Sequence, residues 1–185
     1  MNTASKPRIK PVDVDLTEPL KSKMEKVFPA ALRSPNLYRS VARNEALFID
    51  MIDMNFIGPT GLLDRKMIPP RRRELLILRT CMQAKNEYES HLHERTISER
   101  MGLTLLEIDD LKNADINKDI WSDEDISLIA LNDVLVNTTS VPDDIFERAA
   151  TYFSEPELIE MTLLVGLYTS VAMLVSLIRP EFDPY

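Results

Sequence analysis

The residues of this sequence best suited to chemistry are an acid and an imidazole four positions apart, Glu89 and His93. Side chains with this spacing lie next to each other on a helix, so the two can touch. A carboxylate beside an imidazole favours the protonated ring, whereas burial opposes the charged form of either group. Such a pair can exchange a proton near neutral pH, which is the basis of general acid–base catalysis.

The segment 87–101 places this pair in a protected strip when it is drawn as a helix. The strip is bordered on both sides by apolar side chains: Tyr88, Leu92, Ile97 and Met101. The opposite face carries side chains that we expect to contact water: Glu87, His91, Glu94, Arg95 and Ser98. His93 is therefore expected at a protected site and His91 on the surface. A structural pair that ties this helix to a neighbour is the alternative, because Glu-x-x-x-His arises readily by chance.

A third candidate, Glu74, belongs to the segment just before this one. At helical spacing it falls on the side of Ile77 and Cys81, which favours an inward position. The arginines at 71–73 offer a simpler explanation, a surface ion pair that contributes about 0–1 kcal/mol. An arginine of this run, or Arg79, can instead bind a substrate carboxylate through a two-pronged contact.

Helices must position these residues, because the composition predicts an all-α protein. The sequence has 4 glycines, and most of its 12 prolines fall between apolar segments of helical period. Helices are expected at 17–28, 35–58, 71–85 and 87–101, and then after Thr104, Ser122, Pro142 and Ser154. This gives about eight helices, the last of which ends before Pro180. The segments 71–85 and 87–101 form a central helical hairpin that carries every candidate residue.

Several helix starts carry capping signals. Ser34 followed by Pro35 is typical of a capping residue and the first residue of a helix. Three later starts place a Ser or Thr three residues before an acid: Thr104 and Glu107, Ser122 and Asp125, Ser154 and Glu157. Gly102 stands where a left-handed residue would end the helix at 87–101.

Length and composition predict one domain. A chain of 185 residues, of which 44% are hydrophobic, can bury a core of its own. We expect a polar N-terminal extension at 1–15, which lies on the surface or joins a neighbouring subunit, and a single helical domain at 16–185. The connection from Gly58 to Pro70 is long enough to have a function.

Charge and cysteine content narrow the class of protein. The net charge of -8 argues against a nucleic-acid binder. The single Cys81 cannot form an internal disulfide, and no signal segment opens the chain, so we expect a cytoplasmic protein.

Polar residues interrupt the apolar stretch 161–178, which is expected to be a buried helix and not a membrane span. His91 and His93 point to different sides of a helix, so neither a metal site nor a cofactor is expected.

The hairpin also resembles a known family. The residues that carry the likeness are Arg72 to Arg79, Asn86 to Glu89 with His93, Met101 to Thr104 with Glu107 and Ile108, and Leu158 to Tyr168. In order and spacing they are similar to the carboxymuconolactone decarboxylase and alkylhydroperoxidase-D-like superfamily, over Ile68 to Ile178. The segment from His93 to Gly102 is about one residue longer than this resemblance leads us to expect. The resemblance implies an AhpD-like helical fold and assembly into trimers or hexamers.

The resemblance also implies roles for single residues. In the alkylhydroperoxidase-D branch an acid, a Cys-x-x-Cys pair and a histidine four residues later form a thiol and proton-relay system. Read onto this chain, the acid falls on Glu74, the two cysteine positions fall on Asn86 and Glu89, and the histidine falls on His93. The acid and the histidine at the two ends of the relay are present, but neither cysteine position holds a thiol. Peroxide reduction would therefore need Cys81 or a partner's thiol. The chain looks like the cysteine-free branch, to which lactone decarboxylases belong.

Three functions follow from these observations. The first is a decarboxylase-like lyase acting on a lactone or carboxylate, in which His93 is the general acid or base, Glu89 orients it and Glu74 completes the relay. Tyr88 and Arg79 are predicted to contact the small-molecule substrate. The second is a peroxidase-like antioxidant protein with peroxiredoxin activity. The third is a non-catalytic oligomeric binding protein, for which the apolar last helix offers a subunit contact.

Overall fold

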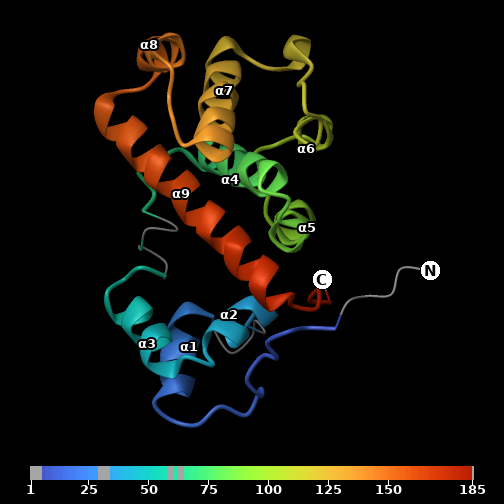
Figure 1. Cartoon of the computed structure of the whole chain (residues 1–185), viewed down its shortest axis with the longest axis vertical. Helices are drawn as coiled ribbons and strands as arrows, with labels where there is room; N and C mark the ends of the chain where they lie inside the picture. The colour runs from blue at the N-terminus through green and yellow to red at the C-terminus, as the bar shows by residue number, and fades with distance from the viewer. Residues whose placement is uncertain (1–5, 29–33, 58–60, 62–64, 185) are drawn as a thin grey trace, which may run out of the picture. The chain divides into compact units, whose positions relative to one another are not determined.

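The computed structural model describes residues 6–28, 34–57, 61 and 65–184. Within these residues all regular secondary structure is helical, with nine α-helices and one short 3-10 helix, so the prediction of an all-α protein is confirmed (Figure 1). The chain divides into two compact units. The first comprises Met1–Lys66 with Leu174–Pro184, and the second comprises Met67–Met173. The predicted boundary between residues 15 and 16 stays a prediction.

The first unit is built on three helices: α1 (Leu20–Val27), α2 (Asn36–Val41) and α3 (Glu45–Asp53). Its core is formed by apolar side chains from α1, from α3 and from the residues just after α2 and α3: Leu20, Met24, Ala42, Phe48, Ile52 and Ile57. Helix α1 lies within the expected segment 17–28, so that helix is confirmed.

The prediction of a single helix at 35–58 is wrong, because the first helix in this segment ends at Val41. The side-chain oxygen of Asn44 accepts a hydrogen bond from the Leu47 N–H at 3.3 Å and so starts α3 as a separate helix. The apolar period runs through the break, which is why the pattern alone predicted one helix. The expected end at Gly58 is wrong as well, because α3 ends at Asp53; Gly58 itself lies outside the described residues.

The predicted cap at the start of α2 is also wrong. Pro35, and not Ser34, is the capping residue, and it has no side-chain oxygen with which to satisfy the first N–H groups. The carboxylate of Asp183 takes this role from the other end of the chain, since it accepts a hydrogen bond from the Asn36 N–H at 3.1 Å. A cap from a distant residue leaves no local signal in the sequence.

The described part of the N-terminal extension lies along the first unit. The Arg8 N–H donates to the carbonyl oxygen of Ile178 at 2.9 Å, and the Val12 N–H donates to that of Arg39 at 3.1 Å. The segment is therefore held by backbone hydrogen bonds to α2 and to the end of the last helix. For residues 6–15 this is the first of the two expected placements, and the contact with a neighbouring subunit stays a prediction.

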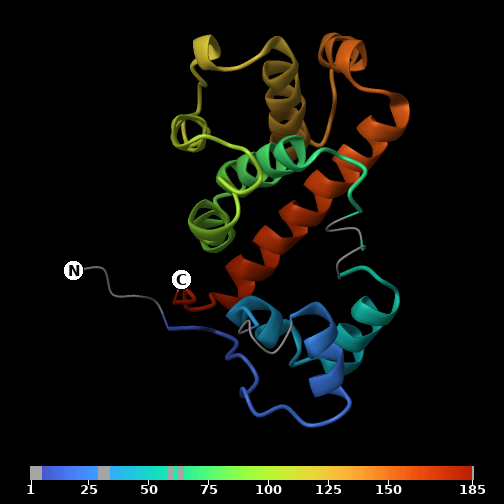
Figure 2. The same ribbon diagram turned by 180° about the vertical axis from the view of Figure 1, so that it is seen from behind.

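The second unit contains the hairpin and the helices that follow it: α4 (Pro70–Gln83), α5 (Glu87–Thr96), α6 (Leu105–Asp110), the 3-10 helix η1 (Lys118–Ile120), α7 (Asp123–Thr138), α8 (Asp143–Tyr152) and α9 (Glu155–Ile178), the last up to Met173. Helix α4 contacts both α5 and α7, and Figures 1 and 2 show it beside them from opposite sides. Every residue from Glu74 to Cys81 is buried, so α4 is the central helix of this unit.

The capping signals of the later helices are confirmed. At α6, Thr104 Oγ1 accepts from the Glu107 N–H at 3.2 Å, while the Glu107 carboxylate accepts from the Thr104 N–H at 2.7 Å. At α7 only half of this arrangement forms. Ser122 Oγ accepts from the Asp125 N–H at 3.1 Å, but the shorter Asp125 carboxylate does not return to the Ser122 N–H.

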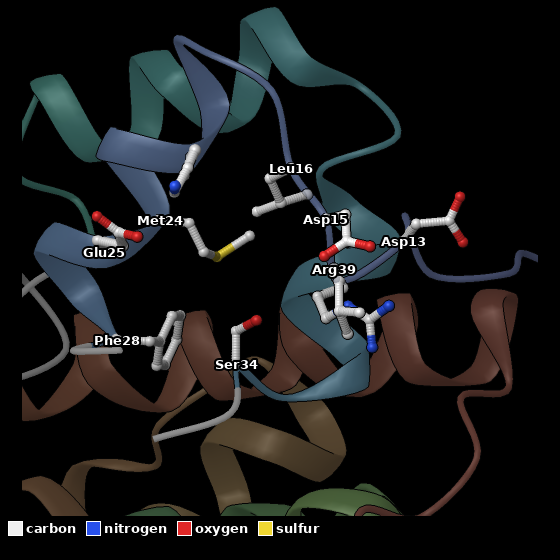
Figure 3. Close-up of a pocket in the computed structure, with 10 residues that line it drawn as sticks. Asp13, Asp15, Leu16, Met24, Glu25, Phe28, Ser34 and Arg39 are labelled. Carbon is white, nitrogen blue, oxygen red and sulfur yellow. The ribbon is translucent and has the colours of Figure 1, made fainter. Parts of the chain in front are cut away.

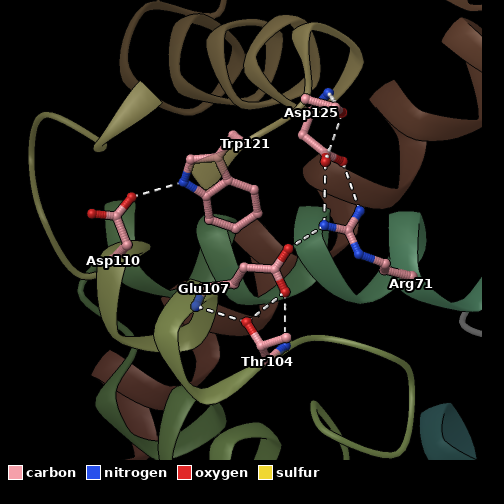
Figure 4. Close-up of polar contacts among 7 residues, drawn as sticks. Arg71, Thr104, Glu107, Asp110, Trp121 and Asp125 are labelled. Carbon is pink, nitrogen blue, oxygen red and sulfur yellow. Dashed lines mark hydrogen bonds and ion pairs between the residues drawn. The ribbon is translucent and has the colours of Figure 1, made fainter. Parts of the chain in front are cut away.

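Arginines of α4 use these same acids to hold the unit together. Arg71 binds Asp125 at 2.8 Å and also Glu107, and so joins α4 to α6 and α7 (Figure 4). Arg72 reaches Glu124 at 2.6 Å and Glu157 at 2.9 Å, which lie at the starts of α7 and α9. These arginines therefore have internal partners.

Arg79 is the most buried of these arginines, with 1% of its surface exposed. Its Nε and Nη2 atoms donate to the two carboxylate oxygens of Asp133 at 2.8 and 2.6 Å. Nη1 donates to the carbonyl oxygens of Leu111 and Asn113 at 2.7 Å each, and Nη2 donates to that of Ala114 at 3.2 Å. All five donors that a guanidinium offers are used. Arg79 therefore has a structural role between α4, α7 and the loop after α6, and its contact with substrate stays a prediction.

Helix α9 was expected to be buried, and one face of it is. That face is formed by Leu158, Met161, Leu164, Val165 and Tyr168, each at most 9% exposed. The other face exposes Ile159, Leu163 and Met173. By length and composition α9 is also the one helix among the described residues that could cross a membrane, with a mean hydropathy of 2.1 in a window that is 39% buried.

Replacing Arg79 with methionine should destabilise the protein strongly. Arg79→Met keeps the bulk of the side chain but leaves the Asp133 carboxylate and three carbonyl oxygens without their donor, and we expect the free energy of unfolding to fall by about 3–5 kcal/mol. Urea unfolding followed by circular dichroism measures this change. The control is Arg95→Met, on the exposed face of α5, which should change stability by less than about 0.5 kcal/mol. Equal stability of the two variants would contradict the assigned role.

Candidate active site

The site begins with Glu74 on α4. Helix α4 starts with Pro70 in its first turn, a position where the missing N–H of proline costs nothing. The helical period then turns Glu74 inward beside Ile77 and Cys81, and all three are 0% exposed. The inward position expected from the sequence is therefore observed, and the alternative of a surface ion pair is excluded for Glu74.

Helix α5 brings the other two candidates to Glu74. Its start is capped by Asn86, whose side-chain oxygen accepts from the Glu89 N–H at 3.2 Å. Its end differs from the expectation, because α5 stops at Thr96 and not at Met101. The His93 carbonyl oxygen accepts from the N–H groups four and five residues later, at 97 and 98, at 2.9 Å each. A turn closed over five residues contains one residue more than an α-helical turn, which accounts for the extra residue noted after His93.

This wide turn places Ser98 differently from what the helical period predicts. On a regular helix Ser98 would lie on the wet face, but it is 0% exposed. Its Oγ donates a hydrogen bond to Glu74 Oε1 at 2.7 Å. Ser98 is thus a site residue that periodicity missed, and the extra residue between His93 and Gly102 was the available signal. Gly102 itself has a φ of 102°, as expected for a left-handed residue.

His93 lies between two carboxylates. Its Nδ1 is 2.8 and 3.0 Å from the two oxygens of Glu74, and its Nε2 is 3.8 Å from Glu89 Oε2. Glu89 and His93 are 5% and 4% exposed. The ring of Tyr168 stands edge-on to the imidazole, with 5.8 Å between the ring centroids. The structure therefore brings the three predicted catalytic residues together, and the tighter partner of His93 is Glu74 from the other helix.

The surroundings of His93 favour its charged form. Burial alone lowers the pKa of the imidazole, and the positive charge of Arg73 acts in the same direction. The negative charge and hydrogen bond of Glu74, together with the charge of Glu89, outweigh both and raise the pKa of His93 above its ordinary value of 6.5. The ring can therefore hold a proton at a pH where an exposed histidine would have lost it.

The remaining candidates are placed as follows. Tyr88 is buried, at 5% exposed, and its contact with substrate stays a prediction. His91 is half-buried, so it is less exposed than expected.

Cys81 is 0% exposed, and burial, followed by the charges of Glu89 and Glu74, raises the pKa of its thiol well above the ordinary value. It is therefore held as a thiol and not as the thiolate that redox chemistry needs. Among the described residues no group of three or more His, Cys, Asp or Glu side chains is arranged to hold a metal ion.

A pocket of about 380 Å³ lies elsewhere, in the first unit, and was not predicted (Figure 3). It lies between α1, the segment 13–16 and the start of α2, and is lined by both charged and apolar side chains, among them Asp15, Leu16, Met24, Glu25, Phe28 and Arg39. Its lining includes neither histidine nor cysteine. The pocket therefore contains none of the catalytic residues predicted from the sequence.

No family model matches the chain, and no curated protein matches it. A solved structure of a protein of unknown function from Agrobacterium tumefaciens, described as a candidate antioxidant defence protein AhpD, is 18% identical, covers 78% of this chain and 97% of that chain, and has a TM-score of 0.66. The debrominase Bmp8 is 13% identical over 95% of this chain and 92% of that chain, with a TM-score of 0.75.

A variant of Bmp8 with a cysteine replaced by alanine, in complex with 2,3,4-tribromopyrrole, is 14% identical over 97% of this chain and 94% of that chain, with a TM-score of 0.74. At these identities the likeness shows the fold. The chain has the AhpD-like helical fold that the resemblance implied.

Replacing Ser98 with alanine should weaken the fold at the site. Ser98→Ala removes a hydrogen bond to a carboxylate with no exposed surface, and we expect a loss of about 1–3 kcal/mol in the free energy of unfolding. The matched control is Ser90→Ala on α5, because the Ser90 hydroxyl donates to the backbone oxygen of Glu87 and not to a carboxylate. Chemical denaturation of both variants measures the difference, and similar losses in the two would refute the role given to Ser98.

The imidazole of His93 should titrate above pH 6.5 in the folded protein. Its stabilising charge is then fully present below the pKa of the unfolded chain and is lost as the pH rises through the higher pKa of the folded state. The stability advantage of wild type over His93→Gln should shrink as the pH rises through this interval. Ring-proton NMR, with His91→Gln to assign the two signals, measures the midpoint. A midpoint below 6.5 would contradict the assignment.

Proposed function

We propose that this chain is a small-molecule enzyme that uses general acid–base chemistry at Glu74, Glu89 and His93. The observation that carries the proposal is a buried imidazole with a carboxylate near each nitrogen, at 2.8 Å on one side and 3.8 Å on the other. A structural pair needs one such partner. Two acids on opposite sides of a ring whose pKa is raised above 6.5 also suit a proton relay.

The reaction proposed is decarboxylase-like, on a lactone or other carboxylic substrate. Glu74, fixed by Ser98, holds Nδ1 and sets the orientation of the ring. Nε2 then faces the substrate side near Glu89 and carries the proton to be transferred. As the bond to the carboxylate breaks, carbon dioxide leaves, the electron pair remains on the substrate, and the proton of His93 moves to the carbon. Glu89 holds the ring while its charge changes.

A thiol-dependent activity is the second candidate, and the name of one structural neighbour, an antioxidant defence protein, favours it. Another neighbour is a debrominase that has been studied as a cysteine variant. This chain has one cysteine, and Cys81 has no exposed surface. Its burial argues against the attack of a thiolate on a peroxide. A peroxidase-like activity would therefore need a thiol from a partner.

Assembly is part of the proposal. The exposed apolar residues of α9, among them Ile159, Leu163 and Met173, suit a contact with further copies of the chain, in a trimer or hexamer. A non-catalytic binding protein with this assembly is the third candidate. We also propose a cytoplasmic location, in keeping with a single, reduced cysteine.

Screening the purified protein against lactones, β-keto acids and hydroperoxides should reveal turnover of a compound of the first two classes. His93→Gln should lower kcat by about 100- to 10,000-fold, because the group that transfers the proton is lost. His91→Gln, from the same helix, is the matched control and should retain activity. Cys81→Ser should leave turnover unchanged.

Two outcomes would redirect the proposal. Loss of hydroperoxide turnover in Cys81→Ser would favour the thiol-dependent activity. If His93→Gln keeps both its assembly, measured by light scattering, and every detected turnover, the non-catalytic binding protein is favoured instead.

A further inference from the structure

The side-chain amide of Asn86 has a donor that the fold does not use. Its Oδ1 accepts from the Glu89 N–H at 3.2 Å, which fixes the orientation of the amide. Its backbone N–H donates to the Cys81 carbonyl oxygen at 2.7 Å, and its backbone oxygen accepts from the Ser90 N–H at 3.1 Å. Within the part of the chain that the structure describes, its Nδ2 atom is buried without a hydrogen-bond partner.

A buried donor of this kind needs an acceptor. Asn86 is 2% exposed, so bulk water does not supply one, and buried polar groups in folded proteins are nearly always paired. Asn44 provides a comparison, because it caps α3 through the same side-chain oxygen but is exposed to solvent. Capping a helix therefore does not require the amide group to be buried. The Nδ2 donor of Asn86 is therefore available to an acceptor from another molecule.

Asn86 belongs to the neighbourhood of the proposed active site. It starts the helix that carries Glu89 and His93, and its backbone N–H is hydrogen-bonded to Cys81. Burial, and then the charges of Glu89 and Glu74, raise the pKa of the Cys81 thiol, so both carboxylates lie near that residue. The positive end of α5 adds to the attraction for an electronegative atom here.

Building on the proposed function, we propose that Asn86 Nδ2 donates a hydrogen bond to the carbonyl oxygen of an uncharged substrate group, such as a lactone, and positions it for His93. A neutral amide at a buried position suits a neutral acceptor, since a carboxylate would lose far more hydration there. Asn86 is thus a positioning residue that selects for a carbonyl.

The test uses the full chain labelled with ¹⁵N, and two probes, δ-valerolactone and its ring-opened anion 5-hydroxypentanoate. Asn86→Asp keeps the oxygen that caps α5 and removes the donor. We expect the lactone to shift the side-chain amide signals of Asn86, which are identified by their absence in the variant. The dissociation constant of the lactone should rise about 10-fold in Asn86→Asp. Asn44→Asp, the same change at the cap of α3, should leave it unaltered.

Several results would overturn this inference. Unchanged lactone binding in a folded Asn86→Asp, or unmoved Asn86 signals in wild type, would assign the donor to an enclosed water. Tighter binding of the anion than of the lactone would refute the uncharged class, and so would a wild type that binds neither probe. The titration and turnover of His93 variants test the proposed function independently of the inference about Asn86. If Asn86→Asp does not fold, Asn86→Ser and the wild-type spectrum decide the matter.

Discussion

A carboxylate with no exposed surface imposes the strongest constraint on this structure. Removing Glu74 from water carries a large cost unless its oxygens are paired and hydrogen-bonded. His93 and Ser98 meet this need from α5 and from the turn that follows it. The hairpin must therefore close so that both reach one side chain of α4. The wide turn after His93 is the local distortion that lets Ser98 do so.

Arginines on α4 hold the hairpin in the second unit. Arg71, Arg72 and Arg79 each bind acids or carbonyl oxygens that belong to later parts of the chain. Because these contacts connect α4 with α6, α7 and α9, the helix that carries Glu74 is fixed on several sides. A proton relay needs this rigidity, since hydrogen bonds weaken steeply with small displacements of their atoms.

The helical period of the sequence correctly predicted the features that depend on the residues of a single helix. The inward side of Glu74 and His93, and the caps at Thr104 and Ser122, follow from residues within a few positions of one another. Ser98 and Arg79 could not be placed in this way. The first depends on a turn that departs from the helical period, and the second depends on carbonyl oxygens more than thirty residues away. The break between α2 and α3 was missed because the apolar pattern continues across a capping residue, Asn44.

The hydrogen bonds at Nδ1 have a consequence for how His93 would work through successive turnovers. In the proposed reaction Glu74 occupies Nδ1, so Nε2 is the atom that faces the substrate. A proton that leaves Nε2 must be replaced before the next turnover, and the two carboxylates beside the ring are the groups that can return it. Protonation of the ring is then a step of its own in each turnover. Glu89, whose carboxylate lies 3.8 Å from Nε2, is the acid nearest to that atom.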